Sequence, residues 1–426
     1  MKYFIHLFST LTIMIAVSCS KDIVDQNTSC DDNSIKSGYS ISLNQIRQYL
    51  SEQSSTLPTK GFNFKIEPIT EGRDTVLYLV NYEDGWEAFS ADKRAPKIFA
   101  KAEKGTITEG DFKTIPALKC MYESFVENVL FLKKNPNSNP TTDFLDSWDD
   151  LDGTSRTSRQ GQSIKTRSVY QLQQSHLLQT KWGQGHPWNI RAPYTDETRQ
   201  THCLTGCGPV AMAQVMYYLQ SRGAISYNPY EDSYTNKFIP DNTDYIILND
   251  TDVSFTSPAS SPSVVWGSMP IDSLDTGNGK SFEAVSTLMV ELGMHTQSEY
   301  YRHSTSTWSN YVPDTFIYQY FFPTNYGDVD FDVLADLILQ DNLPAILLIG
   351  HLDNLNHLSN GHYLVADAIE ETYQESGGDL LSRYIGFNWG WDGLCDDYWF
   401  NTDVINWFAN NIVFNSRYYM VYIVSL

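Results

Sequence analysis

The chain has 426 residues, and its 51 Asp and Glu against 29 Lys and Arg give a formal net charge of −22. This excess of acid excludes a protein that binds nucleic acid or anionic lipid through clustered basic side chains. A hydrophobic content of 41% with an aromatic content of 14% excludes a mostly disordered chain. At roughly 150 residues per domain, the length predicts two or three domains.

The first residues have the features of an export signal. Lys2 is their only charge, and the largely apolar stretch over 3–17 is too short for a membrane span. Ala16 to Cys19 resembles the cleavage box of bacterial lipoproteins, which predicts a signal peptide over 1–18 and a lipidated Cys19. The alternative is an ordinary secretory signal with a chance cysteine. We expect a protein exported from a bacterium, held as a precursor at the outer membrane or cell surface by an acyl group and secreted after processing.

A polar tether over 19–40 leads into a first block of structure, which we place at 41–135. Apolar residues recur at helical spacing from Ile41 to Tyr49, and Ser40 or Ser42 can cap that helix. Glu83 to Gly85 suits a turn between two strands. The expected elements are a helix over 41–49, strands over 76–82 and 85–89, and a helix over 115–132.

Residues 136–168 interrupt these patterns. Pro, Asn, Ser, Thr, Asp and Gly dominate the segment, and basic residues are scattered through it. This composition is typical of an exposed, mobile linker, which is where proteases cut. The segment is either a plain spacer between domains or an activation segment whose cleavage frees the C-terminal part of the chain.

The second block runs from 169 to 426, and its predicted helices precede most of its predicted strands. That order favours an α+β domain with an antiparallel sheet. One helix is expected directly after Cys207. The other expected elements are helices over 282–292 and 331–339 and strands over 344–349, 363–369, 384–388 and 418–424.

Cys207 lies in the segment with the clearest chemical signal. Gly206 and Gly208 flank it, Pro209 suits the first turn of a helix, and the following residues carry almost no charge. We therefore expect Cys207 at the N-terminus of a buried helix. The helix macrodipole there favours the thiolate, which is the nucleophilic form of cysteine. The alternative is a small buried cysteine without a chemical role.

A cysteine nucleophile needs a base, and His362 is the best candidate because it opens an apolar strand after a loop. Its imidazole would take the thiol proton and later protonate the leaving amine. The alternative is a structural histidine at a strand edge. The Asn388 amide or the Trp389 indole, which end the next strand, can orient the ring. Gln184, in a glycine-rich turn, can stabilise an oxyanion together with the Cys207 backbone N–H.

These segments, in this order, resemble the streptopain family of papain-like cysteine peptidases. Gly85 to Ile98 is also similar to the prodomain of that family, so the resemblance covers roughly residues 40–426. Asp392 stands where the family motif has glycine, and extra residues between Ile369 and Tyr384 lengthen a hairpin. The matching motifs are Gln184-Gly185-His186-Pro187-Trp188-Asn189, Gly206-Cys207 with Ala211-Met212-Ala213-Gln214, Gly361-His362 with Asp367, and Asn388-Trp389-Gly390-Trp391-Asp392-Gly393.

The resemblance implies a papain-like α+β fold, with a helical part packed on an antiparallel sheet and a small α+β prodomain in front. It also implies an exported cysteine endopeptidase that is made as a zymogen, cleaves proteins or peptides and is inhibited by its own prodomain. The residues that it implies are Cys207 as nucleophile, His362 as base, Gln184 as oxyanion donor, Asn388 or Trp389 as the group that orients the base, and Ser306 and Gly361 as substrate contacts.

No cofactor and no metal are expected. His202, Cys203 and Cys207 lack a zinc spacing, and the acidic stretches 143–152 and 328–332 lack the pattern of a calcium loop. Two other functions stay open. One is a different Cys–His acyl-transfer enzyme, such as an amidase or a transglutaminase-like protein. The other is a catalytically silent surface binding protein on the same fold.

Overall fold

The computed structural model describes residues 38–56, 63–138, 144–145, 148, 169–224, 237–249, 252, 266–277, 279–320, 322–352, 358–375, 377–405 and 416–423. The predicted signal peptide and Cys19 lie outside these residues, as does most of the predicted linker over 136–168. All described residues belong to one compact unit. Within the described ranges, no helix is both long and apolar enough to cross a membrane.

The N-terminal block combines a four-stranded antiparallel meander with three helices. Ser42 caps the first helix, because Ser42 and Gln45 exchange hydrogen bonds between their side chains and backbone N–H groups. Thr108 and Asp111 form the same reciprocal cap on the second helix. The elements are α1 (Leu43–Thr56), β1 (Lys65–Glu71), β2 (Asp74–Asn81), β3 (Trp86–Ser90), β4 (Ile98–Ala102), α2 (Glu109–Thr114) and α3 (Pro116–Lys134).

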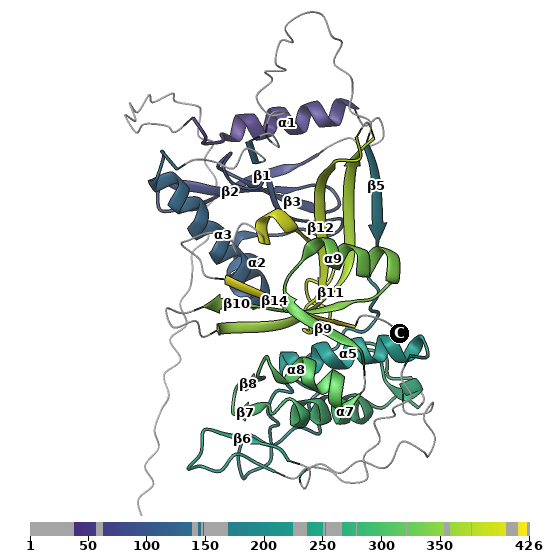
Figure 1. Ribbon diagram of the computed structural model, residues 1–426. Helices are drawn as coiled ribbons and strands as arrows, with labels where there is room; N and C mark the ends of the chain where they lie inside the picture. Colours follow the sequence, from purple (N-terminus) through teal and green to yellow (C-terminus); the bar gives the residue numbers. More distant parts are fainter. Residues whose placement is uncertain are drawn as a thin grey trace, which may run out of the picture. The chain divides into compact units, whose positions relative to one another are not determined.

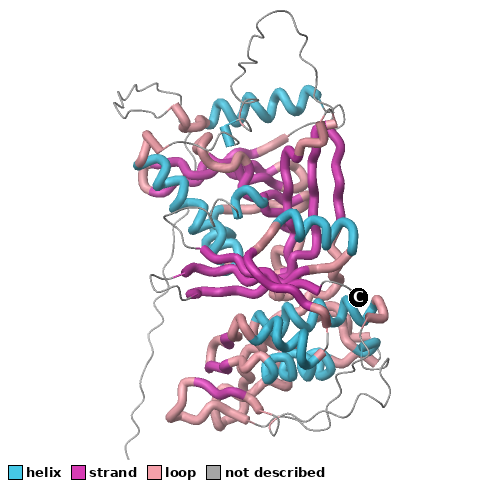
Figure 2. The backbone as a smooth tube through the Cα atoms, in the orientation of Figure 1, coloured by secondary structure: helices cyan, strands magenta, loops and turns pink. Residues whose placement is uncertain are grey.

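One large sheet runs through both blocks of the chain, as the magenta strands of Figure 2 show. Its path is β1-β2-β3-β4-β13-β12-β11-β10-β14-β9, with β5 paired to β11. The junction is the antiparallel pair of β4 and β13, in which Trp399 lies opposite Lys101. The remaining strands of this sheet are β5 (Val169–Gln174), β9 (Thr324–Asp328), β10 (Ala345–Leu352), β11 (Leu358–Gln374), β12 (Leu380–Asn388), β13 (Tyr398–Asn401) and β14 (Ser416–Ile423).

Most helices of the second block gather below β9, in the lower part of Figure 1, whereas the helix over Phe331–Asp336 lies above β9, beside β11. Two of them, α5 and α7, pack on each other, and α5 also packs on β10 and β11. A small second sheet, β6-β7-β8, lies outside the large one. These elements are α5 (Cys207–Ser221), β6 (Tyr245–Ile247), α7 (Phe282–His295), β7 (Glu299–Tyr301), β8 (Thr305–Ser306), α8 (Tyr311–Asp314) with a π-helical turn (Thr315–Gln319), and α9 (Phe331–Asp336) with a π-helical turn (Leu337–Asp341).

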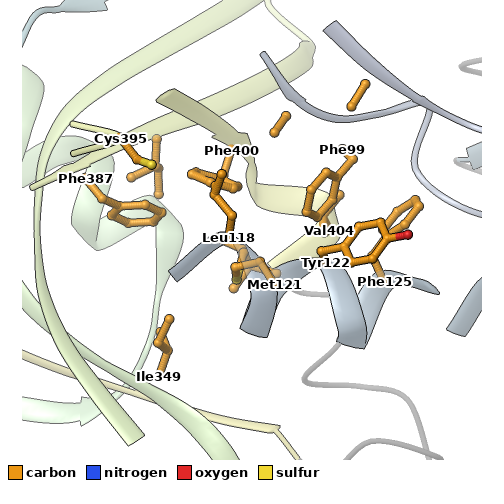
Figure 3. Packing of buried hydrophobic residues seen from close by; sticks show 14 of the residues in the cluster. Phe99, Leu118, Met121, Tyr122, Phe125, Ile349, Phe387, Cys395, Phe400 and Val404 are labelled. Atoms are coloured by element: carbon orange, nitrogen blue, oxygen red, sulfur yellow. The ribbon is translucent and has the colours of Figure 1, made fainter. Parts of the chain in front are cut away.

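Two hydrophobic cores meet across β11. Tyr363 and Val365 belong to the core that β11 shares with α5 and α7. Leu364 and Ala366 point the other way, into a core shared with α3 and β4. Figure 3 shows this second core, in which Phe99 and Phe125 of the N-terminal block lie near Phe387, Phe400 and Val404 of the second block. The sheet is therefore covered on both faces, and one of these covers is the N-terminal block.

The predicted elements are found with shifted ends. The strand predicted over 363–369 is much longer, because β11 pairs along its length with β10, β12 and β5. Strands β1 and β9 have no apolar alternation, since both lie at the ends of the sheet path and bury few side chains. The proposed division into domains at 41–135 and 169–426 stays a prediction.

Trp148 corrects the expectation of an exposed linker over the whole of 136–168. Its side chain is fully buried in a cluster with α1, β2 and β3, and its indole N–H donates to the Ala95 carbonyl at 3.2 Å. The composition of a polar segment hides such an anchor, because one buried indole removes much apolar surface from water. At least this part of the segment belongs to the N-terminal block.

Candidate active site

Cys207 is the first residue of α5, as its flanking residues predict. Its partly buried thiol lies beside the His362 side chain and the backbone N–H groups of Tyr363 and Gly208, and hydrogen bonding from these groups favours its charged form. Burial raises the pKa of this thiol, but the charge of His362 and these hydrogen bonds outweigh it, so the pKa lies below the ordinary value for cysteine. The sulfur is therefore held in an environment that favours the thiolate.

The two glycines beside Cys207 are required because the segment over 305–307 packs closely against them. A Cβ on Gly206 would lie 2.9 Å from the Thr305 side chain, and a Cβ on Gly208 would lie 2.8 Å from that of Thr307. Thr305 also donates a hydrogen bond of 2.6 Å to the Leu204 carbonyl. Ser306, predicted to contact substrate, is exposed between these two threonines and thus lies beside the cysteine loop. Its role stays a prediction.

His362 lies on β11 and is held by the main chain of Trp389. Its Nε2 is 2.9 Å from the Trp389 carbonyl oxygen. A carbonyl only accepts hydrogen bonds, so Nε2 carries the proton of the neutral ring and Nδ1 is the nitrogen free to take the thiol proton. The Trp389 ring lies nearly parallel to the imidazole, with centroids 6.2 Å apart, and the Trp391 ring is 4.9 Å away. Gly361, the other predicted substrate contact, is exposed directly before His362.

Of the two groups expected as alternatives to orient the imidazole, Asn388 and Trp389, the Asn388 amide makes its hydrogen bonds elsewhere. Asn388 Nδ2 donates to the Thr180 carbonyl at 2.7 Å, and its Oδ1 accepts from Gln214 Nε2 at 2.8 Å and from the Gly390 N–H at 3.0 Å. The amide thus holds the turn that carries Trp389. The contact to the ring comes from the Trp389 carbonyl, which no side-chain pattern can indicate.

Gln214 belongs to this buried network, and sequence reasoning gave it no role. Its Oε1 accepts a hydrogen bond of 2.9 Å from the Thr180 hydroxyl, and the residue is fully buried. The network joins α5, which carries Cys207, to the turn that holds His362. The sequence feature that could have indicated this role is a polar amide on an otherwise uncharged, buried helix, because a buried amide needs hydrogen-bond partners.

Trp389 is held on both sides of its backbone. Its N–H donates to the Asp396 carboxyl at 3.0 Å, while its carbonyl contacts His362. Burial raises the pKa of Asp396 to about 7. Asp367, which matches the family motif, is buried elsewhere: it contacts His176 at 2.8 Å and accepts from the Leu178 N–H. It anchors the chain segment that leads to Trp182.

Gln184 lies in a turn that is tied to the cysteine loop. Its backbone carbonyl accepts from the Thr205 N–H at 3.0 Å, two residues before Cys207. The Asn189 amide, at the end of the same turn, donates to the Cys203 carbonyl at 3.0 Å. The Gln184 side chain is partly buried, and its role as an oxyanion donor stays a prediction. Across the described ranges, no cluster of three or more His, Cys, Asp or Glu side chains could hold a metal ion.

Comparison with known proteins identifies the family. The model of the peptidase C10 family matches residues 182–399, just over half of the chain. The chain belongs to the peptidase C10 family. The matched range includes Gln184, Cys207, His362 and the Asn388 turn. The predicted membership of the streptopain family is confirmed, and this C10 protein is a cysteine-type peptidase.

Two solved structures are similar to this chain. A mutant fragment of prointerpain A from Prevotella intermedia superposes with a TM-score of 0.52 at 18% identity, covering 84% of this chain and 98% of that one. Active wild-type interpain A, a cysteine protease of the same organism, gives a TM-score of 0.37 at 19% identity and covers 59% of this chain and 94% of that one. No curated protein matches the chain. The likeness to the prointerpain fragment confirms the predicted α+β papain-like fold.

Asn388→Ala is expected to lower kcat of this C10 peptidase about tenfold. The change leaves the buried Gln214 amide without its acceptor, which costs about 1–3 kcal/mol, and loosens the turn that holds His362. Peptide hydrolysis and thermal unfolding measure both effects. Asn325→Ala is the matched control, because Asn325 is exposed and bonds to the Tyr422 hydroxyl. Full activity of Asn388→Ala would contradict the role of this network.

Proposed function

We propose that this cysteine peptidase is an endopeptidase in which Cys207 is the nucleophile and His362 the general base. The observation that carries the proposal is the placement of the Cys207 thiol beside the His362 imidazole at the N-terminus of α5, where the imidazole helps to lower the pKa of the thiol. The helix dipole and the neighbouring imidazole favour the thiolate together. Such a pair is the arrangement that acyl transfer to sulfur requires.

In the proposed reaction, the Cys207 thiolate attacks the peptide carbonyl carbon and a tetrahedral oxyanion forms. The Gln184 side-chain amide and the Cys207 backbone N–H donate hydrogen bonds to that oxyanion. His362, protonated at Nδ1 by the thiol, gives this proton to the leaving amine, which departs and leaves a thioester. Water then attacks the thioester with His362 as base. The acid product is released, and the free thiol is regenerated. The Trp389 carbonyl keeps the ring oriented throughout.

We further propose that the enzyme is made as an exported zymogen. Residues 41–135 would form the prodomain, and cleavage within 136–168 would free the peptidase domain over 169–426. The pairing of β4 with β13 and the ion pair of Lys101 with Glu370 at 2.5 Å support an intramolecular prodomain, because they join the two blocks. Acylation at Cys19 would tether the precursor to the membrane, and the same cleavage would release the active enzyme.

The test is to incubate purified precursor, natural and Cys207→Ala, and to sequence any new N-terminus. The natural precursor is expected to be cut within 136–168 and then to hydrolyse casein, whereas the variant stays intact and inactive. Added active enzyme should cut the variant at the same bond. A natural precursor that transfers acyl groups to amines but never cleaves casein would contradict the endopeptidase. Active enzyme that still carries the acyl group would contradict the proposed release.

A further inference from the structure

The turn that carries Gln184 has a second attachment, to a segment other than the cysteine loop. The indole Nε1–H of Trp188, four residues after Gln184, donates to Asp392 Oδ1 at 2.5 Å. Trp188 is fully buried, whereas Asp392 is exposed. The carboxylate thus satisfies a buried donor from a residue that is itself largely open to solvent. A charge-assisted bond of this kind is stronger than a bond between neutral groups.

The backbone before Gln184 is fitted to the same carboxylate. A Cβ on Gly183 would lie 2.6 Å from Asp392 Oδ2, so only glycine permits this approach. Asp392 itself has a φ of 55°, which is unfavourable for a residue with a Cβ. The chain accepts this conformation at a position where the family motif has glycine. The contacts of Asp392 with Gly183 and Trp188, on either side of Gln184 in the chain, offer a reason for an aspartate there.

Asp392 also follows closely on the residue that holds the base. Trp389, three positions earlier, contacts His362 through its carbonyl. The turn between them packs on α5, because a Cβ on Gly390 would lie 2.9 Å from the Val210 side chain. One short segment therefore touches the imidazole through Trp389, the nucleophile helix through Gly390 and the Gln184 turn through Asp392.

We propose that Asp392 is a positioning residue that holds the Gln184 turn at its distance from Cys207 and His362. This inference rests on the proposed role of Gln184 as an oxyanion donor. Losing the Asp392 contact frees one side of the turn, while the Thr205 and Asn189 contacts keep the other side attached. The oxyanion donor is then misplaced without any change in the Cys207 and His362 pair. A donor that is out of position loses its effect mainly in the transition state, so kcat falls and KM stays.

The experiment compares four variants, each made as the full chain and then processed to the active enzyme. The concentration of active sites in each is measured by titration with a thiol-reactive peptidyl inhibitor. Asp392→Gly suits the backbone and removes the acceptor, and we expect kcat to fall about tenfold with KM unchanged. Trp188→Phe removes the donor and keeps an aromatic ring, although a smaller one, with the same expected result. Asp392→Asn retains an acceptor and a residue that tolerates this φ, so its kcat should stay within about threefold of the natural enzyme. Asp397→Asn, an exposed aspartate in the same loop, is the control.

Two readouts separate positioning from general damage. The rate of alkylation by iodoacetamide, which needs no oxyanion donor, should be unchanged in every variant. In a Gln184→Ala background, Asp392→Gly should change kcat by less than about twofold, because the donor that it positions is absent. An equal loss of kcat in both backgrounds, a slower alkylation or an unchanged kcat in Asp392→Gly would overturn the inference. Full activity of Gln184→Ala by itself would instead refute the proposed oxyanion donor, and the inference with it.

Discussion

Cys207→Ala is expected to lower kcat/KM for protein substrates by at least about 10⁴-fold, because it removes the proposed nucleophile and leaves only binding and oxyanion stabilisation. The fold should be unaffected. The side chain is small and partly exposed, and the glycines that shape its loop remain. Thermal unfolding of the variant should therefore match that of the natural chain, which separates loss of chemistry from loss of structure.

Cys203 provides the matched control, since it lies in the same loop four residues earlier. It is fully buried, and burial raises the pKa of its thiol to about 12, so the thiol is protonated at neutral pH. Cys203→Ala should keep its activity and its labelling by a peptidyl thiol reagent. Labelling that disappears in Cys203→Ala but persists in Cys207→Ala would show that the nucleophile has been assigned wrongly.

His362→Gln is expected to lower kcat by about 10³–10⁴-fold and to change the pH dependence of alkylation. In the natural protein the pKa of Cys207 is lowered, because the charge and hydrogen bond of His362 outweigh burial. The thiolate, and with it the alkylation rate, therefore persists below the ordinary pKa of cysteine and is lost as the pH falls through the lowered value. Without His362, burial is left as the main opposing effect, so the midpoint should move to higher pH.

The measurement is the rate of iodoacetamide labelling of Cys207 across the pH range, with kcat determined in parallel. His295→Gln is the control, because His295 lies at the end of α7 and contacts Glu291 and Tyr320 there. That variant should keep both the midpoint and kcat. A midpoint in His362→Gln that equals that of the natural enzyme would exclude the imidazole as the group that stabilises the thiolate.

The local sequence pattern was sufficient to predict an element where neighbouring residues determine its structure. Glycine on both sides of Cys207 and the uncharged run after it placed the thiol at the start of α5, where the structure has it. Apolar runs placed β10, β11, β12 and β14 because these strands lie inside the sheet. The edge strands β1 and β9 escaped prediction because edges need few apolar side chains. Trp148 escaped because the segment around it is polar.

The sequence by itself determined the family, the fold class and the pairing of Cys207 with His362, because these depend on residue types in a fixed order. Only the tertiary structure decided what holds that pair in place. The Trp389 carbonyl has no sequence signature, since every residue carries the same backbone group. The bonds from Gln214 to Asn388 and from Trp188 to Asp392 join residues 174 and 204 positions apart. No local periodicity encodes such contacts, because they form only when the helix, the turn and the strand end have packed together.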